Sequence, residues 1–177
     1  TRRRTTRTTR EKMEEERNAQ VFFLFDVSNS MLFASTPKLK CEYAAEIVAS
    51  LSFAILRAGD SVGIAMFSDK INKMLPLSMG PQHYYKVIKE LSNPKNYGGN
   101  FDFGRVLKFL NNYLPRNSVV IVVSDFIGLS SNWRPHFKIA SKKFDFLLLM
   151  MVRDPVDNIL PEDTGQITLE NPFEGEK

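Results

Sequence analysis

Gln20-Val-Phe-Phe-Leu-Phe-Asp26 is the stretch of the chain that decides the fold. It is a short continuous apolar run that ends in an acid, which is typical of a strand buried on both faces of a parallel sheet. A second run, Ser118 to Ser124, consists of Val and Ile between two serines and is followed by Asp125. Longer amphipathic stretches alternate with these runs. The alternation predicts an α/β domain with a central, mostly parallel sheet and helices on both faces.

The remaining elements follow from the same changes of hydrophobic period. We expect helices where apolar residues recur at helical spacing, and strands where short apolar runs are bounded by turn residues. The polar turn at 68–70 joins two apolar runs and suggests a hairpin, so one edge strand that contains Pro76 is expected to be antiparallel. The expected helices cover residues 38–58, 81–91, 103–114 and 133–143, and the other expected strands cover residues 61–67, 71–77, 144–152 and, as a short edge strand, 166–169.

Length and composition fit one ordinary globular domain. The chain has 177 residues, of which 43% are hydrophobic and 25% charged, and its longest apolar stretch, 146–152, is too short to cross a bilayer. Its one cysteine, Cys41, excludes an intramolecular disulfide, and two histidines without a cysteine cluster exclude structural zinc. A reducing compartment such as the cytoplasm is expected. Because the chain begins at Thr1, we expect it to be part of a longer protein or a processed form.

The positive charge of the chain is concentrated at its N-terminus. The whole chain carries a formal net charge of +4, and residues 1–17 hold seven bases against four acids. These residues are interpreted as a basic arm left by an upstream region, and residues 18–177 as the domain. The arm has no interleaved aromatic residues, so nucleic-acid binding is not expected, and no membrane segment is expected in this chain.

Polar side chains follow the two buried runs at the point where each run ends. Asp26, Ser28 and Ser30 alternate along an extended turn, and Asp125 follows the Val/Ile run. Because ligand sites of open parallel sheets gather at the carboxyl ends of the strands, these oxygens are expected to face one another. Two carboxylates and two hydroxyls suit Mg²⁺ or Mn²⁺ better than Ca²⁺. Asp and Ser also cap turns after strands, but the D-x-S-x-S spacing together with a second strand-end acid favours a metal site.

The D-x-S-x-S motif resembles the opening of the metal-ion-dependent adhesion site of the von Willebrand factor A superfamily. The chain is similar in particular to the bacterial group called domain of unknown function 58. Further marks of that group are Glu14-Glu-Glu-Arg17, Gly59-Asp60-Ser-Val-Gly63, and Asp154-Pro-Val-Asp157 with Leu160-Pro161. The resemblance covers almost the whole chain and implies a Rossmann-like von Willebrand A domain.

The chain departs from the family pattern in the loop before the third major helix. The family usually places Gly-Gly-Thr there, and the threonine hydroxyl reaches the metal directly or through water. This chain reads Tyr97-Gly-Gly-Asn-Phe-Asp-Phe-Gly104 and has no threonine in that loop. Asn100 could offer a carbonyl oxygen to the ion and Asp102 a carboxylate, although Asp102 is placed equally well to cap the following helix. The departure puts the metal site in question.

The resemblance implies protein–protein recognition rather than catalysis. Ser28 and Ser30 would ligate the ion directly, Asp26 and Asp125 would neutralise it directly or through water, and an Asp or Glu of a partner would fill an open vertex. The implied partner is a MoxR-type AAA+ ATPase, for which the domain would act as an adaptor in assembly or maturation of a protein complex. Two alternatives stay open: a metal-dependent phosphoester hydrolase, and a structural domain that has lost its ion.

Residues next to the motif and the isolated reactive side chains give weaker signals. Met31, Leu32 and Phe33 are candidates for an apolar rim around the site, and burial of Met31 and Phe33 under the first helix is an equal alternative. Cys41 lies among apolar neighbours on a predicted helix and is expected to be buried and unreactive. The histidines are expected to be structural or solvent-exposed, and the chain has no phosphate-binding loop of the G-x-x-x-x-G-K-[ST] type.

Overall fold

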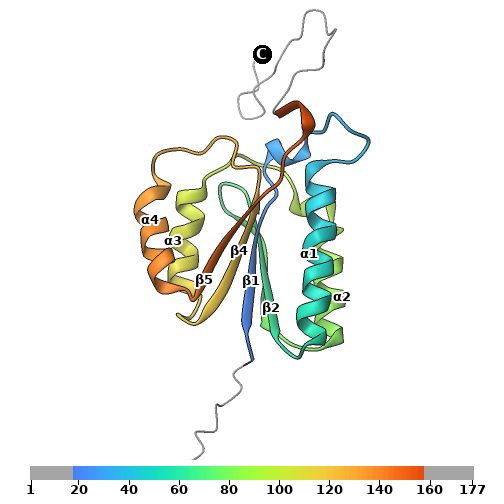
Figure 1. The fold of residues 1–177 in the computed structure, drawn as a ribbon. Helices are drawn as coiled ribbons and strands as arrows, with labels where there is room; N and C mark the ends of the chain where they lie inside the picture. The colour runs from blue at the N-terminus through green and yellow to red at the C-terminus, as the bar shows by residue number, and fades with distance from the viewer. Residues whose placement is uncertain (1–17, 158–177) are drawn as a thin grey trace, which may run out of the picture.

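A five-stranded sheet with helices on both faces forms the body of the protein (Figure 1). The structure, a computed structural model, describes residues 18–157. The strand order is β3-β2-β1-β4-β5, in which only the β2–β3 pair is antiparallel. This architecture confirms the predicted α/β class and its antiparallel edge strand. The strands are β1 (Gln20–Asp26), β2 (Ser61–Phe67), β3 (Ile71–Ser78), β4 (Ser118–Ser124) and β5 (Phe146–Met151).

The helices lie in two layers, with α1 and α2 covering one face of the sheet and α3 and α4 the other (Figure 1). Their bounds are α1 (Lys40–Arg57), α2 (Pro81–Leu91), α3 (Phe103–Tyr113) and α4 (Trp133–Lys143), and the short 3₁₀ turns are η1 (Asn29–Leu32), η2 (Pro94–Asn96) and η3 (Pro155–Asp157). The first helix begins two residues later than predicted because the backbone of Leu39 is extended. The predicted strand at 166–169, the basic arm at 1–17 and Leu160-Pro161 lie outside the described residues.

The central strand explains why the sheet is covered on both faces. Val21, Phe23 and Phe25 of β1 belong to the core under α1 and α2, whereas Phe22 and Leu24 belong to the core under α3 and α4. The continuous apolar run therefore fills two cores by alternation of its side chains. Because β1 lies at the centre of the sheet, the residues that follow it lie at the middle of one sheet edge.

Close packing around β1 accounts for a glycine in the neighbouring strand. A Cβ atom added at Gly63 of β2 would lie 2.5 Å from Cδ2 of Phe22, and this distance is too short for any larger residue without movement of the ring. The fully buried Phe22 ring thus occupies the space that a side chain at position 63 would need.

Two expectations about single residues, and one about membrane-spanning segments, can be compared with the described residues. Cys41 is buried as predicted, and burial raises the pKa of its thiol. His83 is buried and structural, because its Nε2 lies 2.8 Å from the carbonyl oxygen of Val62. Within residues 18–157, no helix is both long enough and apolar enough to cross a membrane.

Candidate functional site

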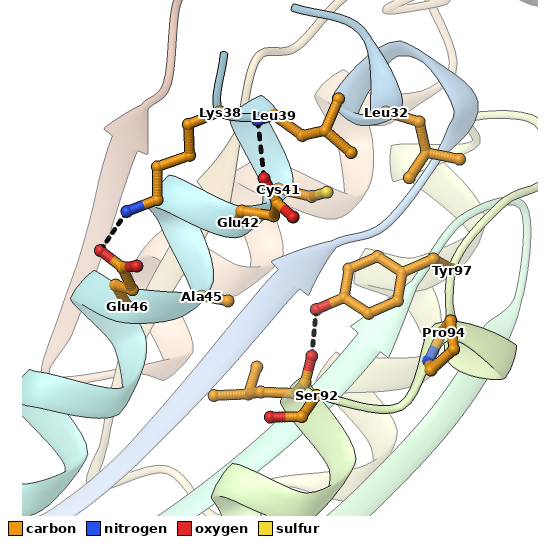
Figure 2. A pocket seen from close by; sticks show the side chains of 11 residues that line it. Leu32, Lys38, Leu39, Cys41, Glu42, Ala45, Glu46, Ser92, Pro94 and Tyr97 are labelled. Carbon is orange, nitrogen blue, oxygen red and sulfur yellow. Dashed lines mark hydrogen bonds and ion pairs between the residues drawn. The ribbon is translucent and has the colours of Figure 1, made fainter.

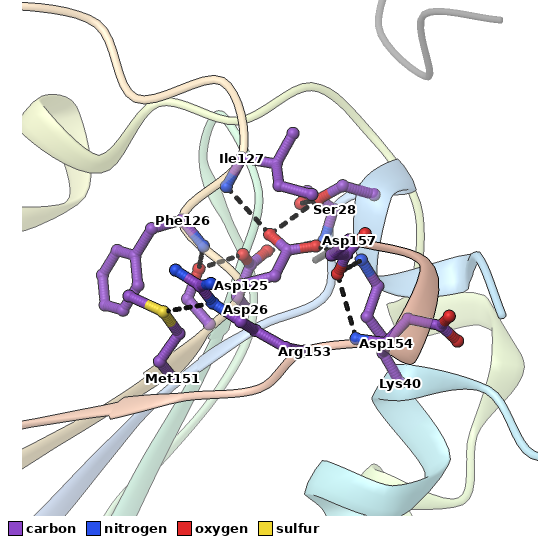
Figure 3. Close-up of polar contacts among 12 residues, drawn as sticks. Asp26, Ser28, Lys40, Asp125, Phe126, Ile127, Met151, Arg153, Asp154 and Asp157 are labelled. Carbon is purple, nitrogen blue, oxygen red and sulfur yellow. Dashed lines mark hydrogen bonds and ion pairs between the residues drawn. The ribbon is translucent and has the colours of Figure 1, made fainter. Parts of the chain in front are cut away.

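The four strand-end residues predicted as a site come together in the structure. Because β1 and β4 are parallel neighbours, their carboxyl ends meet at one edge of the sheet. Ser30 Oγ donates a hydrogen bond of 3.0 Å to Asp125 Oδ1, and the hydroxyls of Ser28 and Ser30 lie 3.2 Å apart. Asp26, Ser28, Ser30 and Asp125 are all buried. We call these four residues the strand-end site (Figure 3 labels three of them).

Asp26 is held by neutral hydrogen-bond donors. Its Oδ1 accepts a bond of 2.8 Å from the backbone N–H of Ser28, and its Oδ2 accepts a bond of 2.5 Å from the hydroxyl of Ser124. Burial raises the pKa of Asp26 to about 6, although the hydrogen bonds from Ser124 and Ser28 oppose this shift. The sequence analysis did not single out Ser124 as a partner of Asp26, although it lies directly before Asp125.

Asp125 is held by a turn with an unusual backbone. Its Oδ1 accepts 3.0 Å bonds from the Ser30 hydroxyl and from the backbone N–H of Ile127. Phe126, which lies between Asp125 and Ile127 in the sequence, has a φ of 56°. This left-handed conformation costs free energy for a bulky residue. The N–H of Phe126 donates to Ser124 Oγ at 2.8 Å. The turn thus directs two successive N–H groups onto polar atoms of the strand end.

A buried lysine places a positive charge next to Asp125. Lys40 Nζ lies 2.8 Å from Asp125 Oδ2 and 3.4 Å from Asp157 Oδ2, and the Lys40 side chain is 3% exposed. The ring of Phe33 lies over the ammonium, with its centroid 5.8 Å from Nζ. Figure 3 shows Lys40 reaching from the start of α1 toward the acids. The sequence analysis missed this residue.

A signal for Lys40 did exist in the sequence. Lys40 is the first residue of α1, where the positive end of the helix dipole disfavours a cation. A lysine at the start of a helix is therefore expected to have acids nearby that offset the unfavourable interaction with the helix dipole. Neither of its two acids is close in sequence, because Asp125 is 85 residues away and Asp157 is 117 residues away.

The turn η3 is fastened next to Lys40 by a second aspartate. Asp154 Oδ2 accepts a bond of 2.7 Å from the backbone N–H of Ser35, whose hydroxyl also donates to Asp154. The backbone N–H of Asp154 donates to Asp157 Oδ2 at 2.9 Å. These bonds hold Asp157 beside the ammonium, and they give Asp154-Pro-Val-Asp157 a structural role next to the site.

The two further ligand candidates lie in the loop before α3. Asp102 is the N-cap of α3, since its Oδ1 accepts a bond of 3.0 Å from the backbone N–H of Arg105. Capping accounts for this side chain without an ion. Asn100 is exposed. The loop itself lies against the motif, because the N–H of Gly98 donates to the carbonyl of Val27 at 2.7 Å.

The three candidates for an apolar rim divide between the two expected alternatives, exposure and burial under the first helix. Leu32 and Phe33 are exposed, whereas Met31 is fully buried. The cause is η1, which turns Met31 into the core under α1 while its two successors stay at the surface.

A pocket of about 590 Å³ lies beside the start of α1, and its lining is mostly apolar (Figure 2). Leu32 of η1, Cys41 of α1 and Tyr97 after η2 are among the residues that line it. The hydroxyl of Tyr97 donates to the carbonyl of Leu91 at 2.5 Å, and Lys38 pairs with Glu46 at 2.5 Å. Since Cys41 directly follows Lys40, the pocket and the strand-end site are neighbours across the first turn of α1.

The donor atoms of the strand-end site match the chemistry of a hard divalent ion. Two carboxylates and two hydroxyls are oxygen ligands of the kind that Mg²⁺ and Mn²⁺ prefer. Among residues 18–157, no three His, Cys, Asp or Glu side chains are grouped so that they could hold a metal ion. An ion here would therefore depend on the hydroxyls of Ser28 and Ser30. It would also share Asp125 with the ammonium of Lys40.

The strand order and the acids at the ends of β1 and β4 define an open, doubly covered α/β domain with a polar cluster at the carboxyl ends of its central strands. The family model described as "Protein of unknown function DUF58" matches residues 1–177. The chain belongs to this family.

Curated relatives from two mycobacteria match most of this chain. Uncharacterized proteins of Mycobacterium tuberculosis and Mycobacterium bovis are 25% identical over 167 residues, which cover 92% of this chain and 51% of theirs. The chain thus spans about half the length of these relatives.

Solved structures from two Bacteroides species share the fold. The conserved hypothetical protein BatB from Bacteroides thetaiotaomicron has a TM-score of 0.59 at 18% identity, covering 76% of this chain and 66% of that one. An aerotolerance-related membrane protein from Bacteroides fragilis, carrying multiple mutations to serines, has a TM-score of 0.61 at 16% identity, covering 89% and 79%. The VWA domain of SpRpn10 has a TM-score of 0.44 at 11% identity, covering 77% and 89%.

Proposed function

We propose that this domain is a protein-recognition module whose strand-end site binds an acidic side chain of a partner through Mg²⁺ or Mn²⁺. The observation that carries the proposal is the convergence of four buried oxygen-bearing side chains from β1 and β4 at one sheet edge. Exposed Leu32 and Phe33 follow the motif directly and would give a partner apolar contact beside this polar centre.

Each residue of the strand-end site has a distinct task in this proposal. Ser28 and Ser30 would offer hydroxyl oxygens to the ion, and Asp26 and Asp125 would balance its charge. When bound, the ion would attract one carboxylate of the partner. Burial of the site strengthens each of these interactions, because water screens charges less in the protein interior.

The resemblance described above favours a MoxR-type AAA+ ATPase as the partner, with this domain as an adaptor in assembly or maturation of another complex. The cytoplasmic location expected from the single cysteine is part of the same proposal. Asn100 and Asp102 are not needed as ligands in this form of the proposal, because Asp102 already caps α3.

Titration calorimetry with Mg²⁺ and Mn²⁺ tests the site. The wild type should bind the ion, Asp26→Ala should not, and acetate or an acidic peptide should strengthen binding. The matched control is Asp145→Ala, which removes an exposed aspartate at the opposite end of the sheet, before β5. Equal binding by the wild type and Asp26→Ala would contradict the proposal. So would turnover of a generic phosphoester that Asp26→Ala abolishes, since this result would favour a hydrolase. Retention of a MoxR-type ATPase on immobilised wild type, but not on Asp26→Ala, would support the partner assignment.

A further inference from the structure

Lys40 has the position and the surroundings of a resident cation of the strand-end site. Its ammonium is nearly inaccessible to solvent and contacts Asp125, whose own side chain is 1% exposed. A buried lysine is stable as an ammonium only where acids or other acceptors replace its lost hydration. Asp125 and Asp157 supply two carboxylate oxygens at 2.8 and 3.4 Å, and the Phe33 ring covers a further side.

This ammonium contacts the same carboxylate that a divalent ion would use. Both oxygens of Asp125 are occupied while Lys40 is bound. Oδ2 faces the ammonium, and Oδ1 accepts two hydrogen bonds. A divalent ion brought next to Asp125 would also repel a positive charge only a few ångströms away. Ion and ammonium therefore compete for Asp125.

The structure offers Lys40 a second carboxylate. Asp157 is more accessible than Asp125, with a side chain that is 19% exposed, and its Oδ2 is already within 3.4 Å of Nζ. The bond from Ser35 to Asp154, and the bond from the Asp154 N–H to Asp157 Oδ2, hold this alternative acceptor in place. The ammonium can therefore leave Asp125 by a small movement and remain paired inside the protein.

We propose that Lys40 sets the metal affinity of the strand-end site: its ammonium competes with the divalent ion for Asp125, and Asp157 receives it when the ion binds. This inference rests on the proposed function. Because Asp157 belongs to η3, it also couples ion binding to the contact between Lys40 and η3. The site would consequently bind Mg²⁺ and Mn²⁺ weakly while Lys40 is paired with Asp125.

Mn²⁺ titration of the purified chain, followed by the electron paramagnetic resonance signal of the free ion, tests the proposal. Lys40→Met should bind Mn²⁺ at least about tenfold more tightly than the wild type, because one repulsive charge next to the ion is removed. Adding Asp26→Ala to Lys40→Met should abolish this binding. Lys38→Met is the matched control, since it removes the same charge from an exposed pair with Glu46 and should leave the affinity unchanged.

Asp157→Asn is the second variant, and it keeps the test informative if Lys40→Met does not fold. It removes the receiving carboxylate from a partly exposed position, so Mn²⁺ affinity should fall severalfold below that of the wild type. Unchanged affinity in Asp157→Asn would contradict the receiving role of that residue.

The outcomes separate the inference from the proposed function. Equal affinity of the wild type and Lys40→Met, with loss of binding in Asp26→Ala, would overturn the competition and leave the metal site standing. Absence of binding in every variant at millimolar Mn²⁺ would overturn both.

Discussion

The ends of β1 and β4 hold the same chemical group in two different ways. Asp26 and Asp125 are both buried aspartates, one at the end of β1 and one directly after the end of the neighbouring strand β4. Asp26 is bound by an N–H group and a hydroxyl, whereas Asp125 has an ammonium within 2.8 Å. Neutral donors leave Asp26 with a pKa raised to about 6. At the β1 end the two hydrogen bonds do not fully offset the burial of Asp26, whereas at the β4 end Lys40 adds an opposite charge to the hydrogen bonds of Asp125.

Removal of the cation at the β4 end is expected to have the largest effect. Lys40→Met leaves the charge of Asp125 buried and unpaired, which costs about 3–5 kcal/mol of unfolding free energy. Urea unfolding of Lys40→Met and of the double variant Lys40→Met/Asp125→Asn measures this effect. The double variant should recover most of the loss, because it also removes the unpaired charge. A double variant no more stable than Lys40→Met would break the comparison.

The neutral hydrogen-bond partners of Asp26 at the β1 end are expected to show as a dependence of the unfolding free energy on pH. The pKa of Asp26 lies above its ordinary value of 3.8, so between about pH 4 and 6 the folded protein keeps a proton that the unfolded chain has released. Stability therefore falls as pH rises through this window and levels off above it. The full contribution is about 3 kcal/mol.

Asp26→Asn should remove this contribution, because an amide does not titrate. The measurement is the difference in unfolding free energy between the wild type and Asp26→Asn at about pH 4 and about pH 7.5. The difference cancels the contributions of carboxylates that are distant from Asp26. Parallel pH profiles for the two proteins would contradict a raised pKa of Asp26 in the folded protein.

The hydroxyl at the end of β4 joins the two strand ends, and its loss should have an intermediate effect. Ser124→Ala removes the donor to Asp26 and the acceptor of the Phe126 N–H, which costs about 1–3 kcal/mol. Ser118→Ala is the control at the other end of the same strand, since that buried hydroxyl has no hydrogen-bond partner among the described residues. Urea unfolding should separate the two variants clearly. Equal losses would mean that the bonds of Ser124 contribute nothing of their own.

The outer carboxylate of Lys40 should matter least for stability. Asp157→Asn weakens a partly exposed contact while Asp125 still neutralises the ammonium, so the expected loss is below about 1 kcal/mol. Urea unfolding measures it. A loss as large as that of Lys40→Met would show that Asp157, and not Asp125, is the principal partner of the lysine.

The sequence predicted the parts of the fold that depend on local pattern. The two-faced apolar run of β1, the Pro76-containing edge strand and the four helices follow from periodicity and turn residues, and the structure confirms them within about two residues. The meeting of Asp26 with Asp125 could also be predicted, because strand ends of a parallel sheet share one edge.

The charged partners of the site could not be predicted in the same way. Lys40 lies on a helix and Asp157 in a 3₁₀ turn, and no period or spacing in the sequence relates either residue to Asp125. For Met31 the sequence left a place in the surface rim and burial under the first helix open as equal alternatives, and the turn η1 decides for burial. Such contacts depend on how the helices and turns pack against the sheet, and this packing cannot be deduced from the pattern of a single sequence.

The contacts of Asp125 also determine when the site can come into being. Ser30 lies 95 residues before it and Lys40 lies 85 residues before it. During synthesis, β1 and the whole of α1 leave the ribosome long before β4. The residues of the motif therefore cannot make their contacts with Asp125 until β4 has been synthesised. If a partner binds the strand-end site as proposed, it would bind only a chain in which β4 is already paired with β1, and its binding would distinguish such chains from nascent or truncated ones.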